Sequence, residues 1–174
     1  MRSVIASLAL LLALGPAPAR AQQNVGATKP DAEVMNYRLS MEKLRKLVPA
    51  QRALNALNAR DPQFFEKIDR QIKAPGRKGP LTVAEQAAIL NQYPAFKRAL
   101  AGAGTTPREW LLTSAAMGNA LIAIAVKEGT LTSKATPPTA AQKVNVALLE
   151  KDDAEFQKIL EQLDELTDEM LSEE

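Results

Sequence analysis

The sequence of 174 residues contains no cysteine and no histidine, and only 4% of its residues are aromatic. Without cysteine there is no disulfide, no thiol nucleophile and no thiolate-bound zinc. Without histidine, a Ser-His-Asp triad and an imidazole metal site are excluded as well. These absences remove most of the familiar catalytic chemistry. We therefore expect a protein that is not an enzyme and that carries no cofactor.

Oxygen-only metal binding and carboxylate catalysis remain open on composition, but no motif supports either. The acidic C-terminal segment lacks the Asp-x-Asp-x-Asp-Gly pattern of an EF-hand loop. The sequence Gly76-Arg77-Lys78-Gly79 lacks the spacing of a phosphate-binding P-loop and indicates a turn. Basic residues are dispersed and aromatic stacking residues are few, which argues against nucleic acid as a partner. We assign no catalytic, cofactor-binding or metal-binding residue.

The first 21 residues have the pattern of a cleavable export signal. Arg2 precedes an uncharged run from Val4 to Leu14, and small residues stand at Ala19 and Ala21, with the spacing that a signal peptidase recognises. The uncharged run has 11 residues, fewer than the ~20 of a permanent membrane span. We expect cleavage after Ala21, a mature chain that begins at Gln22, and a periplasmic or extracellular location.

The mature chain has the pattern of one all-α domain. Residues 22–30 show no periodicity and are expected to be flexible, and residues 31–174 are expected to form the helical domain. From Asp31 onward apolar residues recur at intervals of three and four, which predicts a first helix that bends or restarts at Pro49. Apolar and polar residues nowhere alternate for long, so no strand is predicted.

Later helices are marked by their capping signals. A Ser or Thr followed three residues later by Glu or Gln, or a proline at the first helical position, is typical of a helix start. Such starts are expected at Asp61-Pro62, Thr82, Pro94, Thr106-Pro107 and Thr139 or Ala140, with a restart at Asp152 or Asp153.

One of these helices, from Trp110 to Val126, carries no charged residue. As a helix it would be about 25 Å long, shorter than the ~30 Å hydrocarbon core of a bilayer. We therefore expect the central buried helix of an irregular bundle of about five or six helices, with a membrane span as the alternative. Trp110 is expected to pack against Phe residues of the short helices. In a fully buried helix, Gly118→Leu would overpack the core and cost about 1–3 kcal/mol.

Charge is distributed unevenly along the chain. Residues 22–143 contain 18 basic and 9 acidic residues, whereas residues 144–174 contain 2 basic and 11 acidic ones. The acidic helix could pack by its leucine stripe with its charges near basic residues of the same chain, bind a cationic partner, or simply be solvated. If it binds a partner, the basic face is left for an anionic lipid or polymer. The candidate interaction surface comprises Lys43, Arg45, Lys46, Arg52, Glu161, Asp164, Glu165 and Asp168.

Three segments resemble small exported bacterial helical proteins of uncharacterised function. They are Thr106 to Trp110, Val144 to Glu150, and Leu81 to Ala84 leading into Tyr93-Pro94. The resemblance covers about residues 34–166 and consists mostly of capping signals. It implies an all-α fold and an extracytoplasmic location, and it assigns no activity to any residue.

Taken together, these patterns favour an exported, non-catalytic binding or interaction protein. Long leucine stripes on the first and last helices could leave an apolar groove for a partner protein or an apolar ligand, or for self-association. The alternative is membrane association, through the basic face on anionic lipid or through insertion of the uncharged helix.

The export signal predicts the mass of the mature protein. The intact mass of the exported protein, measured by mass spectrometry, should correspond to a chain that starts at Gln22. The same protein retained in export-blocked cells should keep residues 1–21. An exported product that still carries those residues would contradict the prediction.

Overall fold

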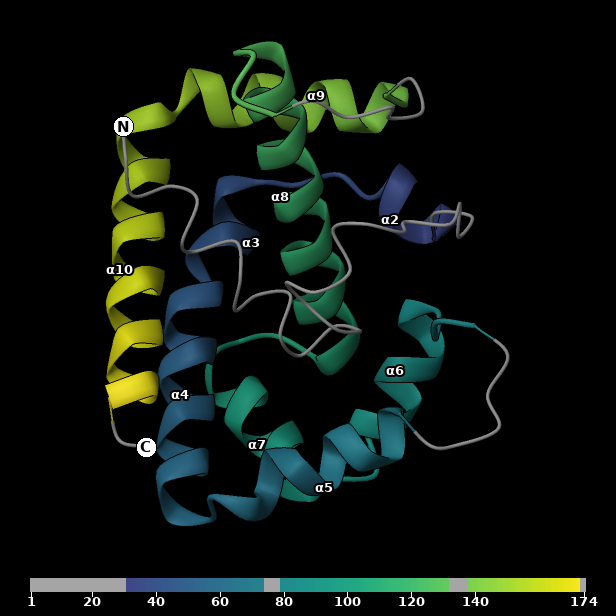
Figure 1. Ribbon diagram of the computed structural model, residues 1–174, viewed down its shortest axis with the longest axis vertical. Coiled ribbons are helices and arrows are strands. Elements are labelled where there is room, and N and C mark those ends of the chain that lie inside the picture. The colour runs from purple at the N-terminus through teal and green to yellow at the C-terminus, as the bar shows by residue number, and fades with distance from the viewer. Residues whose placement is uncertain (1–30, 74–78, 132–137, 173–174) are drawn as a thin grey trace.

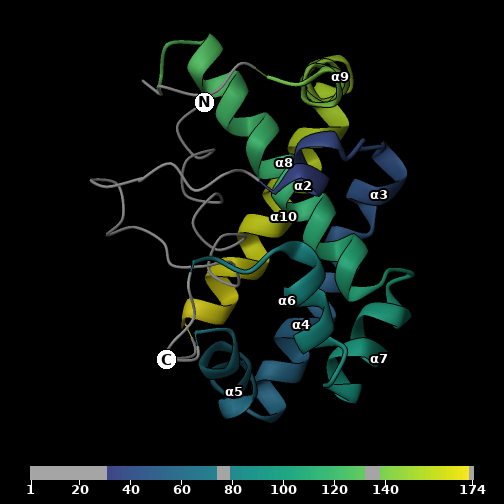
Figure 2. The same cartoon turned by 90° about the vertical axis from the view of Figure 1, so that its right-hand side faces the viewer.

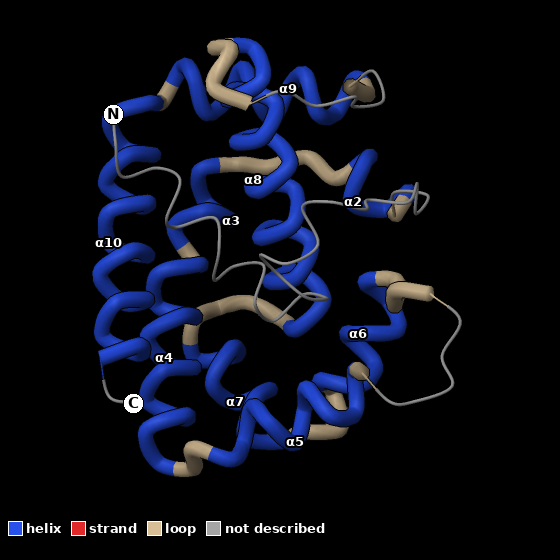
Figure 3. The backbone as a smooth tube through the Cα atoms, in the orientation of Figure 1, coloured by secondary structure: helices blue, strands red, loops and turns tan. Residues whose placement is uncertain are grey.

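A computed structural model describes residues 31–73, 79–131 and 138–172. The predicted leader and the predicted flexible segment 22–30 lie outside these residues. The described residues form helices and connecting loops, with no strand among them (Figure 3). The all-α prediction is therefore confirmed. The helices are α2 (Ala32–Asn36), α3 (Met41–Arg45), α4 (Leu47–Arg60), α5 (Gln63–Ile72), α6 (Val83–Leu90), α7 (Pro94–Gly102), α8 (Pro107–Lys127), α9 (Ala140–Lys151) and α10 (Asp153–Ser172).

The predicted first helix is divided into α2, α3 and α4, so its continuity was predicted wrongly. The backbone is extended at Tyr37 and Ser40, and α3 begins where the Ser40 hydroxyl accepts from the amide of Lys43 at 3.3 Å. The helix restarts at Leu47, ahead of Pro49. Pro49 therefore lies in the first turn of α4, where a backbone donor has no partner within the helix to lose. This division gives the described residues more helical segments than the sequence suggested.

The capping signals placed most of the other helix starts well. At α5 the helix begins at Gln63, with Pro62 at the N-cap position and no side-chain cap bond, so the predicted cap by Asp61 is wrong. Thr82 and Glu85 form a complete capping box at α6, and Thr139 and Gln142 form another at α9. At α8 the hydroxyl of Thr106 accepts from the amide of Glu109 at 3.2 Å. These starts were predictable because each cap involves residues only three apart in sequence.

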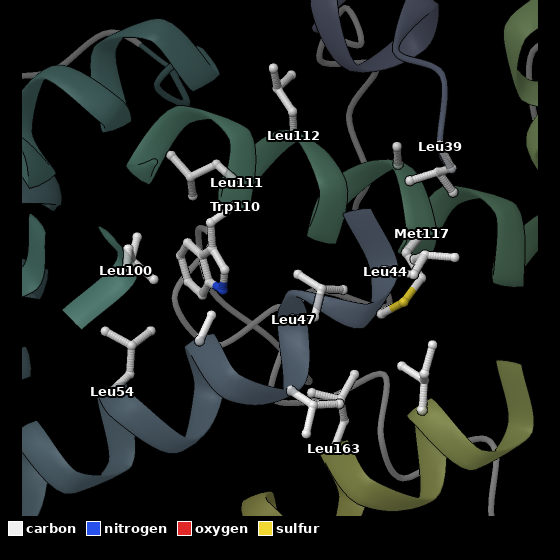
Figure 4. Close-up of a cluster of buried hydrophobic side chains, with 14 of the residues drawn as sticks. Leu39, Leu44, Leu47, Leu54, Leu100, Trp110, Leu111, Leu112, Met117 and Leu163 are labelled. Carbon is white, nitrogen blue, oxygen red and sulfur yellow. The ribbon is translucent and has the colours of Figure 1, made fainter. Parts of the chain in front are cut away.

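Helix α8 lies at the centre of the helical arrangement (Figure 1). Helices α4 and α10 lie side by side, while α5, α6 and α7 gather at one end of the molecule and α9 crosses the other end (Figures 1 and 2). Helix α8 packs against α2, α4, α6, α7 and α9. The buried cluster in Figure 4 lies between these helices, and its fully enclosed members include Leu44, Leu54, Leu100 and Met117.

Aromatic rings connect the short helices to α8. The ring of Trp110 meets Phe96 of α7 edge to face, with centroids 5.8 Å apart. Phe65 of α5 lies 6.4 Å beyond Phe96 and 5.4 Å from Phe64. The predicted contact between Trp110 and a Phe of the short helices is confirmed. Edge-to-face pairs of this kind favour one relative orientation of the helices that carry them.

Burial along α8 is uneven, which corrects the expectation of a fully buried helix. Trp110 to Ser114 are buried, whereas every residue from Leu121 to Val126 is half-buried, and Leu121 and Ile124 pack against the buried cluster. Gly118 is also half-buried, and a Cβ atom placed on it would meet no heavy atom within 4 Å. The expected overpacking by Gly118→Leu is therefore wrong, because this side of the helix faces open space.

The open space at Gly118 predicts a stabilising substitution. Gly118→Ala should raise the free energy of unfolding by about 0.5–1 kcal/mol, because glycine in a helix interior loses more backbone freedom on folding than alanine does. Urea unfolding measures the change. Gly102→Ala is the matched control, since Gly102 is equally uncrowded but ends α7, where the gain should be smaller. A destabilised Gly118→Ala would show that this side of α8 is covered.

Candidate interaction surfaces

The first candidate surface is the last part of α8, from Leu121 to Val126, called here the apolar end. All six of its residues are half-exposed. The amide of Leu131 donates to the carbonyl of Ala125 at 3.2 Å, so Leu131, itself 39% exposed, lies beside this segment. In Figure 2, one side of the apolar end has no described helix next to it.

In α8, polar residues are buried in the first half, whereas the aliphatic residues of the apolar end are less deeply buried. Thr113 and Ser114 are buried in the first half, where the hydroxyl of Thr113 is 3.1 Å from the hydroxyl of Tyr37. The Ser114 hydroxyl has no hydrogen-bond partner among the described residues. The apolar end, by contrast, is half-exposed. A helix that served only as a core element would bury its most apolar part, because the free energy gained on folding increases with the apolar surface area removed from water. In α8 the apolar end is instead less deeply buried than the polar residues of the first half.

Helix α9 borders this surface. Lys127, at the end of α8, pairs with Glu150 of α9 at 2.6 Å, and Val144 of α9 is 47% exposed. In length and composition, α8 could cross a membrane: its 21 residues include an 18-residue window of mean hydropathy 1.4, of which 44% is buried in the structure. The rest of that window is half-buried, and Leu121 and Ile124 within it pack against the buried cluster.

The second candidate surface is the charged region predicted on α3, α4 and α10. Helix α10 packs against the domain by an apolar stripe, as expected if the acidic helix is part of the fold of its own chain. The stripe comprises Phe156, Ile159, Leu160, Leu163 and Leu166, all buried. On α4, the side-chain amide of Asn55 donates to the carbonyl of Leu166 at 2.5 Å. The acidic helix is therefore held mainly by apolar contacts.

The predicted basic residues have different partners. Arg45 forms a two-pronged contact with Glu155 of α10, at 2.5 and 3.0 Å. Lys46 forms an ion pair at 3.1 Å with Glu42, which precedes it by four residues in sequence. Lys43 lies 4.1 Å from the centre of the Tyr37 ring and donates to the carbonyl of Arg38. Arg52 is exposed on α4.

The predicted acidic residues lie on the side of α10 away from its apolar stripe. Glu161, Glu165 and Asp168 are exposed and Asp164 is half-buried. Within the described part of the chain, none of these four carboxylates forms an ion pair. In the described part of the chain, the ion pair between a predicted basic residue and α10 is that of Arg45 with Glu155. Glu155 was not among the acidic residues predicted from sequence. The paired residue is at the start of α10, where the helix passes α3.

The contact between Arg45 and Glu155 shifts both ionisation equilibria. The hydrogen bond from Arg45 lowers the pKa of Glu155, and the same bond raises the pKa of Arg45. Both side chains are largely exposed, so solvent screens their attraction. The pair orients α10 against α3 more than it stabilises the fold.

A buried amide that sequence reasoning missed organises the other side of the molecule. Asn145 of α9 is 1% exposed; its Oδ1 accepts from the amide of Leu39 at 2.9 Å, and its Nδ2 donates to the carbonyl of Tyr37 at 2.9 Å. Both bonds hold the extended link between α2 and α3. A single Asn among the apolar residues of the segment from Val144 to Leu149 was the available signal, because a buried polar group needs partners.

The described residues contain no group of three Asp or Glu side chains placed to hold a metal ion. Searches of protein families, of curated proteins and of solved structures find no match to this chain. The resemblance to exported bacterial helical proteins remains an expectation from sequence. The geometry described above is therefore the basis on which a function is proposed.

The lowered pKa of Glu155 predicts how stability depends on pH. Because Glu155 ionises more readily in the folded chain, its pair stabilises the fold above the ordinary pKa of glutamate and is lost as pH falls through the folded pKa. Glu155→Gln should therefore lower the thermal midpoint at about pH 7 and have little effect at about pH 3.

Glu161→Gln is the matched control, because Glu161 is exposed, lacks an ion pair in the described chain and stands four residues before the like-charged Glu165. It should raise the midpoint at neutral pH or leave it unchanged. If both substitutions lower the midpoint equally, the contact with Arg45 contributes nothing specific.

Proposed function

We propose that this chain is an exported, non-catalytic binding protein whose partner contacts the apolar end of α8. The observation that carries the proposal is the inverted polarity of α8, which buries Thr113 and Ser114 and leaves Leu121 to Val126 half-exposed. Proteins rarely leave contiguous apolar surface open to water unless it is used for contact. The export pattern of residues 1–21 supports a role outside the cytoplasm.

The chemistry of the apolar end indicates what kind of partner fits it. Its residues are aliphatic and uncharged, with Lys127 and Glu150 neutralising each other at its edge. Such a surface favours the apolar face of a partner helix or an apolar small ligand over a charged polymer. Without cysteine or histidine, the chain is suited to binding more than to catalysis.

A second candidate function, membrane association, is favoured by the length and hydropathy of α8. Two modes are distinct: insertion of the uncharged helix, and adsorption of basic residues on anionic lipid. Insertion would require α8 to leave the contacts that bury Trp110, Leu112 and Met117. For this reason binding of a partner in solution is the primary proposal.

The apolar end predicts the effect of one added charge. Ile122→Lys should reduce the fluorescence of an apolar dye such as 8-anilinonaphthalene-1-sulfonate several-fold, with the thermal midpoint retained, because Ile122 is half-exposed and lies outside the buried cluster. Ala154→Lys, on the exposed side of α10, is the matched control and should leave dye fluorescence unchanged. Equal dye fluorescence in both variants would contradict the proposal.

The two membrane modes are tested with the same wild-type protein. Protein that stays in the membrane fraction after both carbonate and high-salt washing indicates insertion, and protein released by salt indicates adsorption. The primary proposal requires protein that is released without either treatment and does not float with neutral or anionic vesicles.

A further inference from the structure

Residues 31–40, called here the strap, are attached to the rest of the domain largely through polar contacts. At one end, Asp31 Oδ2 accepts from the amide of Val83 in α6 at 2.7 Å, and Glu33 pairs with Arg108 of α8. These contacts join the strap to elements that follow it in sequence by more than 50 residues.

The middle of the strap is held from α8 and α9. The hydroxyl of Thr139 donates to the carbonyl of Met35 at 2.6 Å, and the hydroxyl of Tyr37 is 3.1 Å from that of Thr113. Asn145 completes the set with its two bonds to the strap backbone. Side chains of α8 and α9 and a backbone amide of α6 therefore converge on one short segment.

The apolar contribution of the strap is small by comparison. Of its ten residues only Val34 and Leu39 are buried, and its helix α2 has five residues. Helices of this length are not stable in water by themselves. The strap thus depends for its order on the contacts that α6, α8 and α9 provide.

The strap also covers apolar surface. Val34 and Leu39 belong to the same buried cluster as Met117, beside which Leu39 appears in Figure 4. Helix α2 packs against both α8 and α9, so the strap closes the seam between these two helices. Ile124 follows Thr113 and Met117 at eleven and seven residues, which places all three on one side of α8. Ile124 is half-buried and packs against the cluster, so the covered seam is continuous with one side of the apolar end.

From these contacts we infer that the strap is a latch that opens as a unit and regulates the apolar surface. In the closed state Asn145 holds the strap over the seam between α8 and α9. Opening breaks the polar contacts, withdraws Val34 and Leu39, and extends the accessible apolar surface from the apolar end toward Thr113. This inference rests on the proposed function, because it assigns regulation to the same binding surface.

Native-state hydrogen exchange of the full chain tests the latch directly. Amides of the strap should exchange at least about ten-fold faster than buried amides of α4, because local opening needs less free energy than global unfolding. Asn145→Ala should accelerate strap exchange by about a further ten-fold, the effect of losing roughly one net hydrogen-bond contribution. Because the same loss lowers the free energy of global unfolding, α4 exchange should accelerate by no more than this factor, and the strap should remain the faster-exchanging segment.

Asn55→Ala is the matched control. Asn55 also donates a side-chain amide bond to a backbone carbonyl, but that carbonyl belongs to Leu166 of α10, and the bond joins α4 to α10 instead of holding the strap. This variant should leave strap exchange unchanged. Dye fluorescence should rise about two-fold in Asn145→Ala and stay constant in Asn55→Ala, because only the first exposes the seam.

The outcomes separate the latch from the proposed function. Strap amides that exchange as slowly as α4 amides in the wild type would overturn the latch, even if Asn145→Ala fails to fold. Faster strap exchange with unchanged dye fluorescence would also overturn it, since opening would then expose no binding surface. Either result leaves the proposed function intact, because Ile122→Lys tests that surface independently. If Ile122→Lys has no effect, the proposed function fails whatever the strap does.

Discussion

Burial of the first half of α8 is the interaction on which the rest of the structure depends. No disulfide is available, so apolar packing must hold the helices together. Helix α8 packs against α2, α4, α6, α7 and α9, and Trp110 and Met117 are among its members of the buried cluster. Several of these helices are short, and short helices are stable only when a packed face supports them. The second half of α8 is left with fewer neighbours because the short helices α6 and α7 end below it (Figure 1).

This arrangement gives α8 two roles along its length. Its first half is a structural core that tolerates Thr113 because Tyr37 supplies a hydroxyl partner. Its second half is bordered by α9 and is covered only in part. The strap contacts Arg108 and Thr113 in the first half, and Asn145 links it to α9. Core packing, the proposed binding surface and its proposed regulation therefore share one helix.

Ion pairs fix the orientation of α10 relative to α3 more than they stabilise the fold. The acidic helix α10 is held by its apolar stripe, and its one ion pair to another helix in the described chain, between Glu155 and Arg45, is largely exposed. Exposed pairs are screened by solvent and add little to stability. The remaining carboxylates of α10, including Glu161 and Glu165, keep this side of the molecule strongly negative. The charge asymmetry seen in the sequence is thus retained as a feature of one surface.

The sequence by itself determined the helical class and most helix starts, because a cap such as Thr82 with Glu85 depends on residues three apart. It also indicated the apolar stripe of α10, because helical periodicity is local. It could not determine the break at Tyr37, since Asn145 reaches that backbone from 108 residues away. Nor could it show that α8 is half-exposed from Leu121 onward, because exposure depends on which helices lie alongside. Tertiary structure decided these features: burial and long-range hydrogen bonds exist only once distant segments have been brought together.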